Sequence, residues 1–196
     1  MNRSFCLLTM TMALPLLACT GAIEGSSDPG AGAGGVSGVT SGAGGGTGGV
    51  SGGIADPYST PVVCTSKTMW TMGTRGSGSM LPGQACIACH SKGEGPLFAL
   101  GGTVYPTAHE PDSCNGGPLA AMSRVVITGA DGNAVTLTPN SSGNFSYTGA
   151  LVMPYTAKVT YMGRERAMIA KQMSGDCNSC HTEMGTMMAP GRIMLP

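Results

Sequence analysis

The sequence predicts a mainly β protein, a small antiparallel sandwich with little helix. The first observation is a series of short runs rich in β-branched residues, several of which alternate apolar and polar side chains. The second is that glycine-containing turns, Asp131-Gly132 and Ser142-Gly143 among them, separate these runs. The third is the scarcity of helical periodicity, with one segment of about two turns expected at 164–172.

The predicted strands follow one another at short intervals. They are expected at 102–105, 124–128, 134–138, 145–147 and 154–161. Residues 129–133 and 139–144 form the turn-rich connections, and their glycines supply the positive φ that tight turns need. Strands of this length and spacing indicate an antiparallel sandwich.

The middle of the chain, about 101–162, resembles the transthyretin-like, carboxypeptidase-regulatory type of Ig-like β-sandwich. The resemblance is carried by Gly102-Thr103-Val104, Val125-Val126-Ile127, Gly143-Asn144-Phe145 and the segment 154–159. A long insertion between Val104 and Val125 departs from that pattern. The resemblance implies an antiparallel sandwich.

The first 56 residues are not expected to join this fold. Residues 1–18 read as an export signal, with Arg3 followed by an apolar stretch too short to span a bilayer. The signal ends in Leu16-Leu17-Ala18-Cys19, which resembles the lipobox of bacterial lipoproteins and implies lipid on Cys19. An ordinary cleavable signal is the alternative. Residues 19–56, rich in glycine, form the expected flexible tether, and 57–196 the folded domain.

Net charge sets limits on the partners. The formal net charge is zero and only 10% of residues are charged, so neither nucleic acid nor a polybasic membrane patch is indicated. Contact with a membrane is expected through the lipid anchor only. Thr20 after the lipid cysteine resembles outer-membrane sorting signals, which implies a position facing the periplasm or the cell surface.

Two CxxCH motifs carry the chemistry, Cys86-Ile87-Ala88-Cys89-His90 and Cys177-Asn178-Ser179-Cys180-His181. The spacing places two thiols about one helical turn apart, matching the vinyl groups of a porphyrin, and the next residue offers an imidazole to the iron. The motifs resemble those of c-type cytochromes. This implies two haem c groups, bound covalently by Cys86, Cys89, Cys177 and Cys180, with His90 and His181 as proximal iron ligands.

Three other interpretations of the cysteine pairs compete with haem attachment. A Cys₄ zinc site is disfavoured because 87 residues separate Cys89 from Cys177. Redox dithiols of the thioredoxin type need a βαβ pattern, which the sequence lacks. Structural disulfides would leave both following histidines unexplained. Cys64 and Cys114 remain as an even pair, and a disulfide is expected in an oxidising compartment.

The distal iron ligands stay open. His109 is the only other histidine, in a proline-bounded loop, and is either a distal ligand or an exposed loop residue. Glu110 beside it is an acid–base candidate or a surface charge. Met80, just before the first motif, is the first methionine candidate, with core packing as its alternative; Met168, Met173, Met184, Met187 and Met188 flank the second motif.

These observations predict an electron carrier rather than an enzyme, with no catalytic residues assigned. Its expected partners are redox proteins, namely other cytochromes or membrane oxidoreductases, and further copies of the chain. A small peroxidase-like haem enzyme and a surface interaction module stabilised by haem are the alternatives. Ready binding of CO or cyanide would favour the enzyme, because it needs an open iron position.

Overall fold

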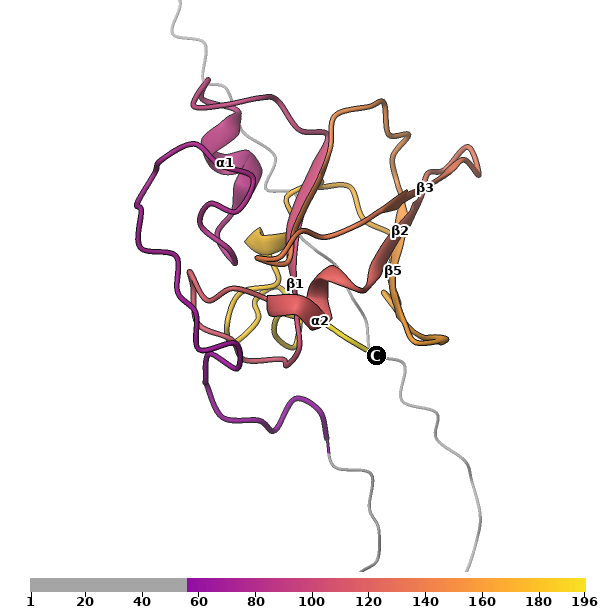
Figure 1. The fold of residues 1–196 in the computed structure, drawn as a ribbon. Helices are drawn as coiled ribbons and strands as arrows, with labels where there is room; N and C mark the ends of the chain where they lie inside the picture. Colours follow the sequence, from indigo (N-terminus) through magenta and orange to yellow (C-terminus); the bar gives the residue numbers. More distant parts are fainter. Residues whose placement is uncertain (1–55) are drawn as a thin grey trace, which may run out of the picture.

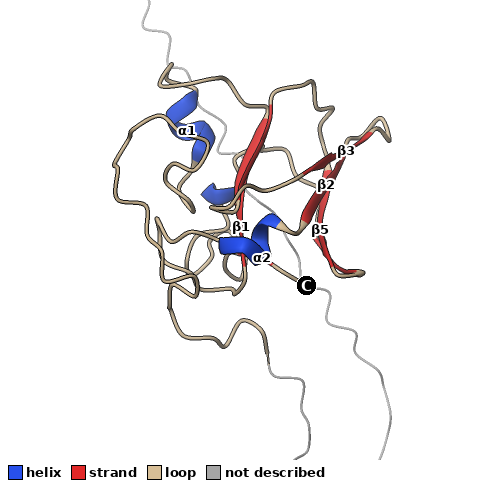
Figure 2. Ribbon diagram, in the orientation of Figure 1, coloured by secondary structure: helices blue, strands red, loops and turns tan. Residues whose placement is uncertain are grey.

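The computed structural model describes residues 56–196, which form two β-sheets and little helix (Figure 1). The predicted signal peptide, the lipid site at Cys19 and nearly all of the tether lie outside the described residues. Two short α-helices, α1 (Cys86–His90) and α2 (Gly117–Ala121), and a 3-10 turn, η1 (Cys177–Ser179), accompany the sheets (Figure 2). The predicted mainly β, sandwich-like fold is confirmed. Among the described helices, none has the length and apolar character needed to cross a membrane.

The larger sheet has four antiparallel strands in the order β3-β2-β5-β6. They span Ala134–Leu137 (β3), Arg124–Thr128 (β2), Thr156–Tyr161 (β5) and Arg164–Ala167 (β6). Alternation along β2 explains the sheet's inner face, since Val125 and Ile127 are buried while Arg124 is exposed. Val159 of β5 lies opposite Val125 and extends this apolar face.

The smaller sheet has the order β4-β1-β7. Its strands are β1 (Leu100–Tyr105), antiparallel β4 (Asn144–Tyr147) and parallel β7 (Ile193–Met194). All six residues of β1 are buried, because β1 is the middle strand and is covered on its faces. In Figure 1, α1 and the labelled strands of the larger sheet lie on opposite sides of β1.

The predicted turns are present. Gly132 between β2 and β3 has φ +79°, and Gly143 before β4 has φ +83°, a backbone region that favours glycine. Gly143 also packs so closely on the carbonyl oxygen of Val104 that a Cβ there would overlap it. This turn carries the chain from the larger sheet to the smaller one.

The helix expected at 164–172 is wrong. Arg164–Ala167 forms strand β6, paired with β5 from Lys158↔Ala167 to Tyr161↔Arg164. The two strands are joined by Met162 and Gly163, both with positive φ, as a two-residue hairpin turn requires. Pairing with β5 overrides the helical propensity of the segment, and Lys158 and Glu165 form an exposed ion pair across the two strands.

Candidate functional site

The two CxxCH motifs lie together against β1, one on each of its faces. A Cβ placed on Gly101 would come 3.2 Å from the Cβ of Cys86, and one placed on Gly102 would come 2.9 Å from the Cβ of Cys177. Successive strand residues face opposite sides, so the adjacent glycines give each motif its own face of the strand. The absence of side chains here allows both cysteines to approach the backbone closely.

The second motif is tied to β1 and to the chain that leads into the first motif. Its Asn178 is 2% exposed and accepts the N–H of Thr103 at 3.1 Å through Oδ1. The Nδ2 of Asn178 donates to the carbonyl oxygen of Gln84 at 2.9 Å and lies 3.9 Å from the sulfur of Cys86. A residue inside the second motif therefore fixes the start of the first.

Both motif histidines present the same nitrogen arrangement. The Nδ1 of His90 bonds to the carbonyl oxygen of Pro96 at 2.8 Å, and that of His181 bonds to the carbonyl oxygen of Gly191 at 2.9 Å. A carbonyl only accepts, so each Nδ1 carries a proton, and in the neutral form of the ring the lone pair then lies on Nε2. Within residues 56–196 neither Nε2 makes a hydrogen bond. Metal-ligating histidines commonly donate from one ring nitrogen in this way and bind the metal through the other.

The surroundings of the two rings differ. The His90 ring packs on Phe98, with ring centroids 4.4 Å apart. Burial lowers the pKa of His181, although its bond to Gly191 opposes this shift. The lower pKa favours the neutral imidazole, which is the form that binds iron.

An apolar cavity of about 410 Å³ lies against the second motif. Cys177, Cys180 and His181 form part of its wall, and apolar side chains of β2 and β5 line the sheet side. Met187 and Met188, which both have positive φ, contribute another part of the lining. A largely apolar cavity of this size is typical of small-molecule and cofactor sites. These residues fit an apolar macrocycle attached through the motif.

The motif cysteines are not equivalent. Cys86, Cys89 and Cys177 are free thiols, and burial raises the pKa of both Cys86 and Cys177 to about 12. Cys180 is disulfide-bonded in this structure, with its sulfur 4.0 Å from that of Met187. Covalent attachment of a cofactor at Cys180 would therefore require its reduced thiol.

His109 is 5% exposed, so the interpretation of an exposed loop histidine is wrong. Its Nδ1 bonds to the carbonyl oxygen of Glu183 at 2.6 Å and its Nε2 to that of Tyr58 at 2.7 Å. Both nitrogens face acceptors, so both carry protons, and these two bonds raise the pKa of His109. In this arrangement neither nitrogen is available to iron.

Met80 is half-buried in the segment before α1. Its carbonyl oxygen accepts a 2.8 Å hydrogen bond from the Nδ2 of Asn144, which anchors the segment to β4. Its role as an iron ligand stays a prediction.

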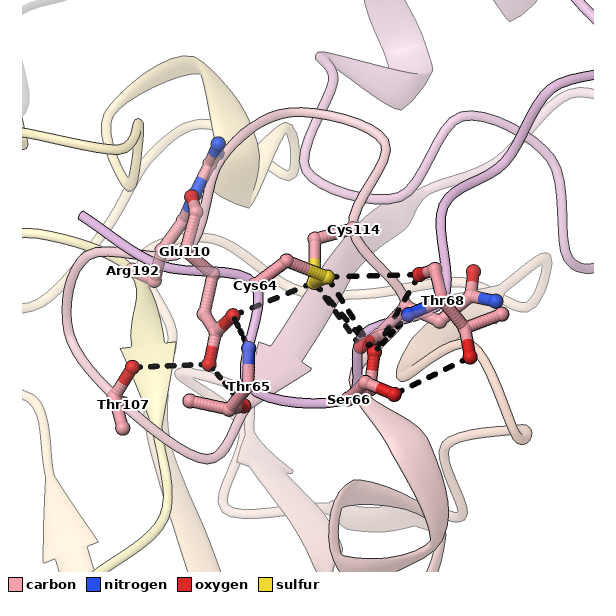
Figure 3. The surroundings of a disulfide bond; sticks show 9 residues. Cys64, Thr65, Ser66, Thr68, Thr107, Glu110, Cys114 and Arg192 are labelled. Carbon is pink, nitrogen blue, oxygen red and sulfur yellow. Dashed lines mark hydrogen bonds between the residues drawn. A yellow bond between two sulfur atoms is a disulfide. The ribbon is translucent and has the colours of Figure 1, made fainter.

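The predicted Cys64–Cys114 disulfide is present (Figure 3). It closes a loop whose sequence includes His109. Glu110 beside it is fully buried, not a surface charge, and its carboxylate accepts from Thr65 N at 2.9 Å and from Thr107 Oγ1 at 2.9 Å. The sulfurs of Cys64 and Cys114 are bonded to each other, so they do not form a metal site with Glu110.

Arg192 is a structural centre that the sequence did not suggest. It is 2% exposed and donates to the carbonyl oxygens of Gly83 and Glu110, both at 2.8 Å. It also donates to the carbonyl oxygen of His181 at 3.3 Å and to Asp112 at 2.6 Å. One side chain thus joins the approach to the first motif, the loop at 110–112 and the end of the second motif. A single arginine near the end of the chain carries no sequence pattern that would reveal this.

Comparison with protein-family models, with curated proteins and with solved structures found no match to this chain.

Proposed function

We propose that this protein is a dihaem c-type cytochrome that carries electrons. One haem c would be attached through Cys86 and Cys89, with His90 on its iron. The other would be attached through Cys177 and Cys180, with His181 on its iron. The observation that carries the proposal is the shared arrangement of the motif histidines, each with Nδ1 bonded to a backbone carbonyl and Nε2 without a hydrogen bond in the described residues.

Attachment uses the chemistry of the thiols. Each cysteine S–H adds across a porphyrin vinyl group, so a carbon–sulfur bond forms and the hydrogen goes to the other vinyl carbon. No electrons are gained or lost in this addition. Because Cys180 is disulfide-bonded in the structure, a thiol reductant must first return its sulfur to the S–H form.

The bound iron would supply one-electron transfer, and the polypeptide would set its surroundings. At the second motif, the apolar side chains of β2 and β5 would exclude water from the macrocycle. At both motifs, the carbonyl bond on Nδ1 would hold the imidazole plane and its tautomer. Redox proteins and other copies of the chain are the proposed partners, for a lipid-anchored protein facing the periplasm or the cell surface.

Four methionines line the cavity at the second motif, Met168, Met187, Met188 and Met194, and of these Met187 and Met188 are the proposed thioether ligands of the second iron. Both line the cavity that also contains His181, and both hold a positive φ that is uncommon for methionine. Ligation by either thioether should give a near-infrared charge-transfer band in the oxidised protein. The band should disappear in Met187→Leu if Met187 is the ligand, and in Met188→Leu if Met188 is.

The decisive experiment measures covalent haem on the exported protein. The chain is produced in a host with haem-attachment machinery, then analysed by pyridine haemochrome absorbance and intact mass. Wild type should carry two haems, and each of Cys86→Ala/Cys89→Ala and Cys177→Ala/Cys180→Ala should carry one. Cys64→Ser/Cys114→Ser removes two cysteines outside the motifs and should retain both haems. Wild-type protein without covalent tetrapyrrole would refute the proposal.

Binding of external ligands separates a carrier from an enzyme. Iron coordinated on both sides should resist CO in the ferrous state and cyanide in the ferric state. Rapid binding at either haem would favour the peroxidase-like alternative.

A further inference from the structure

Asp176 connects the two motifs directly. It immediately precedes Cys177, and its Oδ2 accepts the backbone N–H of Ala88 in the first motif at 2.9 Å. Helix α1 has no side-chain cap of its own, because residue Ala85 occupies its N-cap position. A carboxylate at the first turn of a helix satisfies amides that lack a partner within the helix. The residue before the second motif thus completes the helix of the first.

The second carboxylate oxygen makes Asp176 unusual. Oδ1 is buried and has no hydrogen-bond partner among the described residues, and no described lysine or arginine forms an ion pair with Asp176. Burying a carboxylate oxygen without a partner is costly, so its presence at this position calls for an explanation. The carboxylate lies between the two motifs, bonded to Ala88 of the first and adjacent in sequence to Cys177 of the second.

The charge of Asp176 affects the pKa of a cysteine thiol in each motif. Burial is the largest cause of the raised pKa of the Cys86 and Cys177 thiols, and the charge on Asp176 raises the pKa of each further. Burial raises the pKa of Asp176 itself, while the amides of α1 oppose this by favouring the carboxylate. The same negative charge therefore acts on the first cysteine of both attachment sites.

We propose that Asp176 is a positioning residue shared by both haems and that its charge lowers the reduction potential of each. The proposal rests on the proposed function. Reduction adds an electron to the iron centre, so a nearby uncompensated negative charge stabilises the oxidised state more than the reduced one. The two potentials should therefore respond together to a change at this one residue.

The test replaces Asp176 in the full exported chain. Asp176→Asn removes the charge and keeps an oxygen that can accept from α1, while Asp176→Glu keeps the charge. Asp131→Asn is the matched control, because Asp131 is an exposed turn residue bonded only within its own turn. Haem content is measured first, followed by a spectroelectrochemical redox titration at neutral pH.

The expected result is two haems in Asp176→Asn, with both midpoint potentials shifted upward. Asp176→Glu and Asp131→Asn should stay close to wild type. Unchanged potentials, or a shift of only one, in a variant that carries two haems would overturn the proposal. If Asp176→Asn lacks haem, Asp176→Ser takes its place, since a hydroxyl oxygen can also cap the helix. Should neither neutral variant attach two haems while Asp176→Glu does, Asp176 acts in attachment and the proposal fails.

A second readout does not depend on haem. In the cofactor-free folded protein, loss of the Asp176 charge should lower the pKa of Cys86 and so increase its rate of alkylation at a fixed pH. Mass spectrometry of the labelled peptide would measure that rate in Asp176→Asn and in Asp131→Asn. An unchanged rate would contradict the proposed reach of the charge. Absence of haem from the wild type would refute the proposed function and, with it, the effect on reduction potentials, whereas the effect of Asp176 on Cys86 would still be measured in the cofactor-free protein.

Discussion

Replacing Arg192 by methionine should strongly destabilise the folded domain. The guanidinium is buried and donates to the carbonyl oxygens of Gly83 and Glu110, both at 2.8 Å. Arg192→Met fills part of the same volume but donates no hydrogen bond. It therefore leaves buried carbonyl groups unsatisfied at segments far apart in the chain.

The size of the loss follows from these contacts. Each buried acceptor left without a partner costs about 1–3 kcal/mol. The ion pair with Asp112 adds little, because the Asp112 side chain is 62% exposed and solvent screens it to at most about 1 kcal/mol. Two carbonyl groups, with a weaker third bond to His181 at 3.3 Å, give an expected loss of roughly 3–5 kcal/mol in the free energy of unfolding.

Urea unfolding followed by far-ultraviolet circular dichroism would measure this loss. Asp112→Asn is the control, and it should lose less than about 1 kcal/mol because it breaks only the exposed ion pair. Equal effects of the two variants, or a loss under about 1 kcal/mol in Arg192→Met at an unchanged slope, would refute the reasoning.

Three further predictions concern single features of the fold. Cys64→Ser/Cys114→Ser removes a disulfide that closes a loop with a sequence separation of 50. Chain entropy predicts that the free energy of unfolding, measured in urea, falls by about 4 kcal/mol. A fall below about 1 kcal/mol would contradict this prediction. The pKa of His109 is raised above 6.5 in the folded state, so its stabilisation is full below that pH and is lost as the pH rises through the folded pKa. Wild type should therefore lose stability with rising pH relative to His109→Gln, and parallel profiles would show that His109 contributes nothing. Gly102→Ala places a Cβ 2.8 Å from the ring of Phe145 and should lower the free energy of unfolding by about 1–3 kcal/mol. Gly76→Ala, whose Cβ would have nothing within 4 Å, should be nearly neutral. Equal thermal midpoints of the two variants would argue against the close packing at Gly102.

Local sequence signals predicted most of the sheet. The strand expected at 124–128 matches β2 residue for residue, and four others are recovered with shifts of one or two residues at their ends. Alternation and turn chemistry act within a few residues, so they are readable without tertiary knowledge. Strand β6 was missed because its turn uses Met162-Gly163 in place of the Asn-Gly or Asp-Gly that usually marks such hairpins.

Strand β7 was missed for a different reason. It has only two residues, Ile193 and Met194, and it pairs in parallel with β1, which lies about ninety positions earlier. No local pattern specifies such pairing. The order of the strands likewise depends on contacts between segments far apart in sequence.

The candidate site likewise combines features that a local sequence pattern reveals with contacts between distant segments. Each CxxCH motif is visible because its chemistry requires five consecutive residues. The partners that position the motifs are remote: Asp176 bonds to Ala88 at a separation of 88 residues, and Arg192 bonds to Gly83 at a separation of 109. A single Asp or Arg forms no sequence pattern from which such a role could be predicted. The burial of Glu110 is similarly fixed by Thr65, 45 residues away.

The contacts that bring the motifs together are all made by protein atoms. Gly101 and Gly102 admit the two cysteines to opposite faces of β1, and Asn178 and Asp176 connect the second motif to the first. None of these contacts requires a bound porphyrin. Under the proposed function, the relative position of the two attachment motifs would therefore be set by the polypeptide itself.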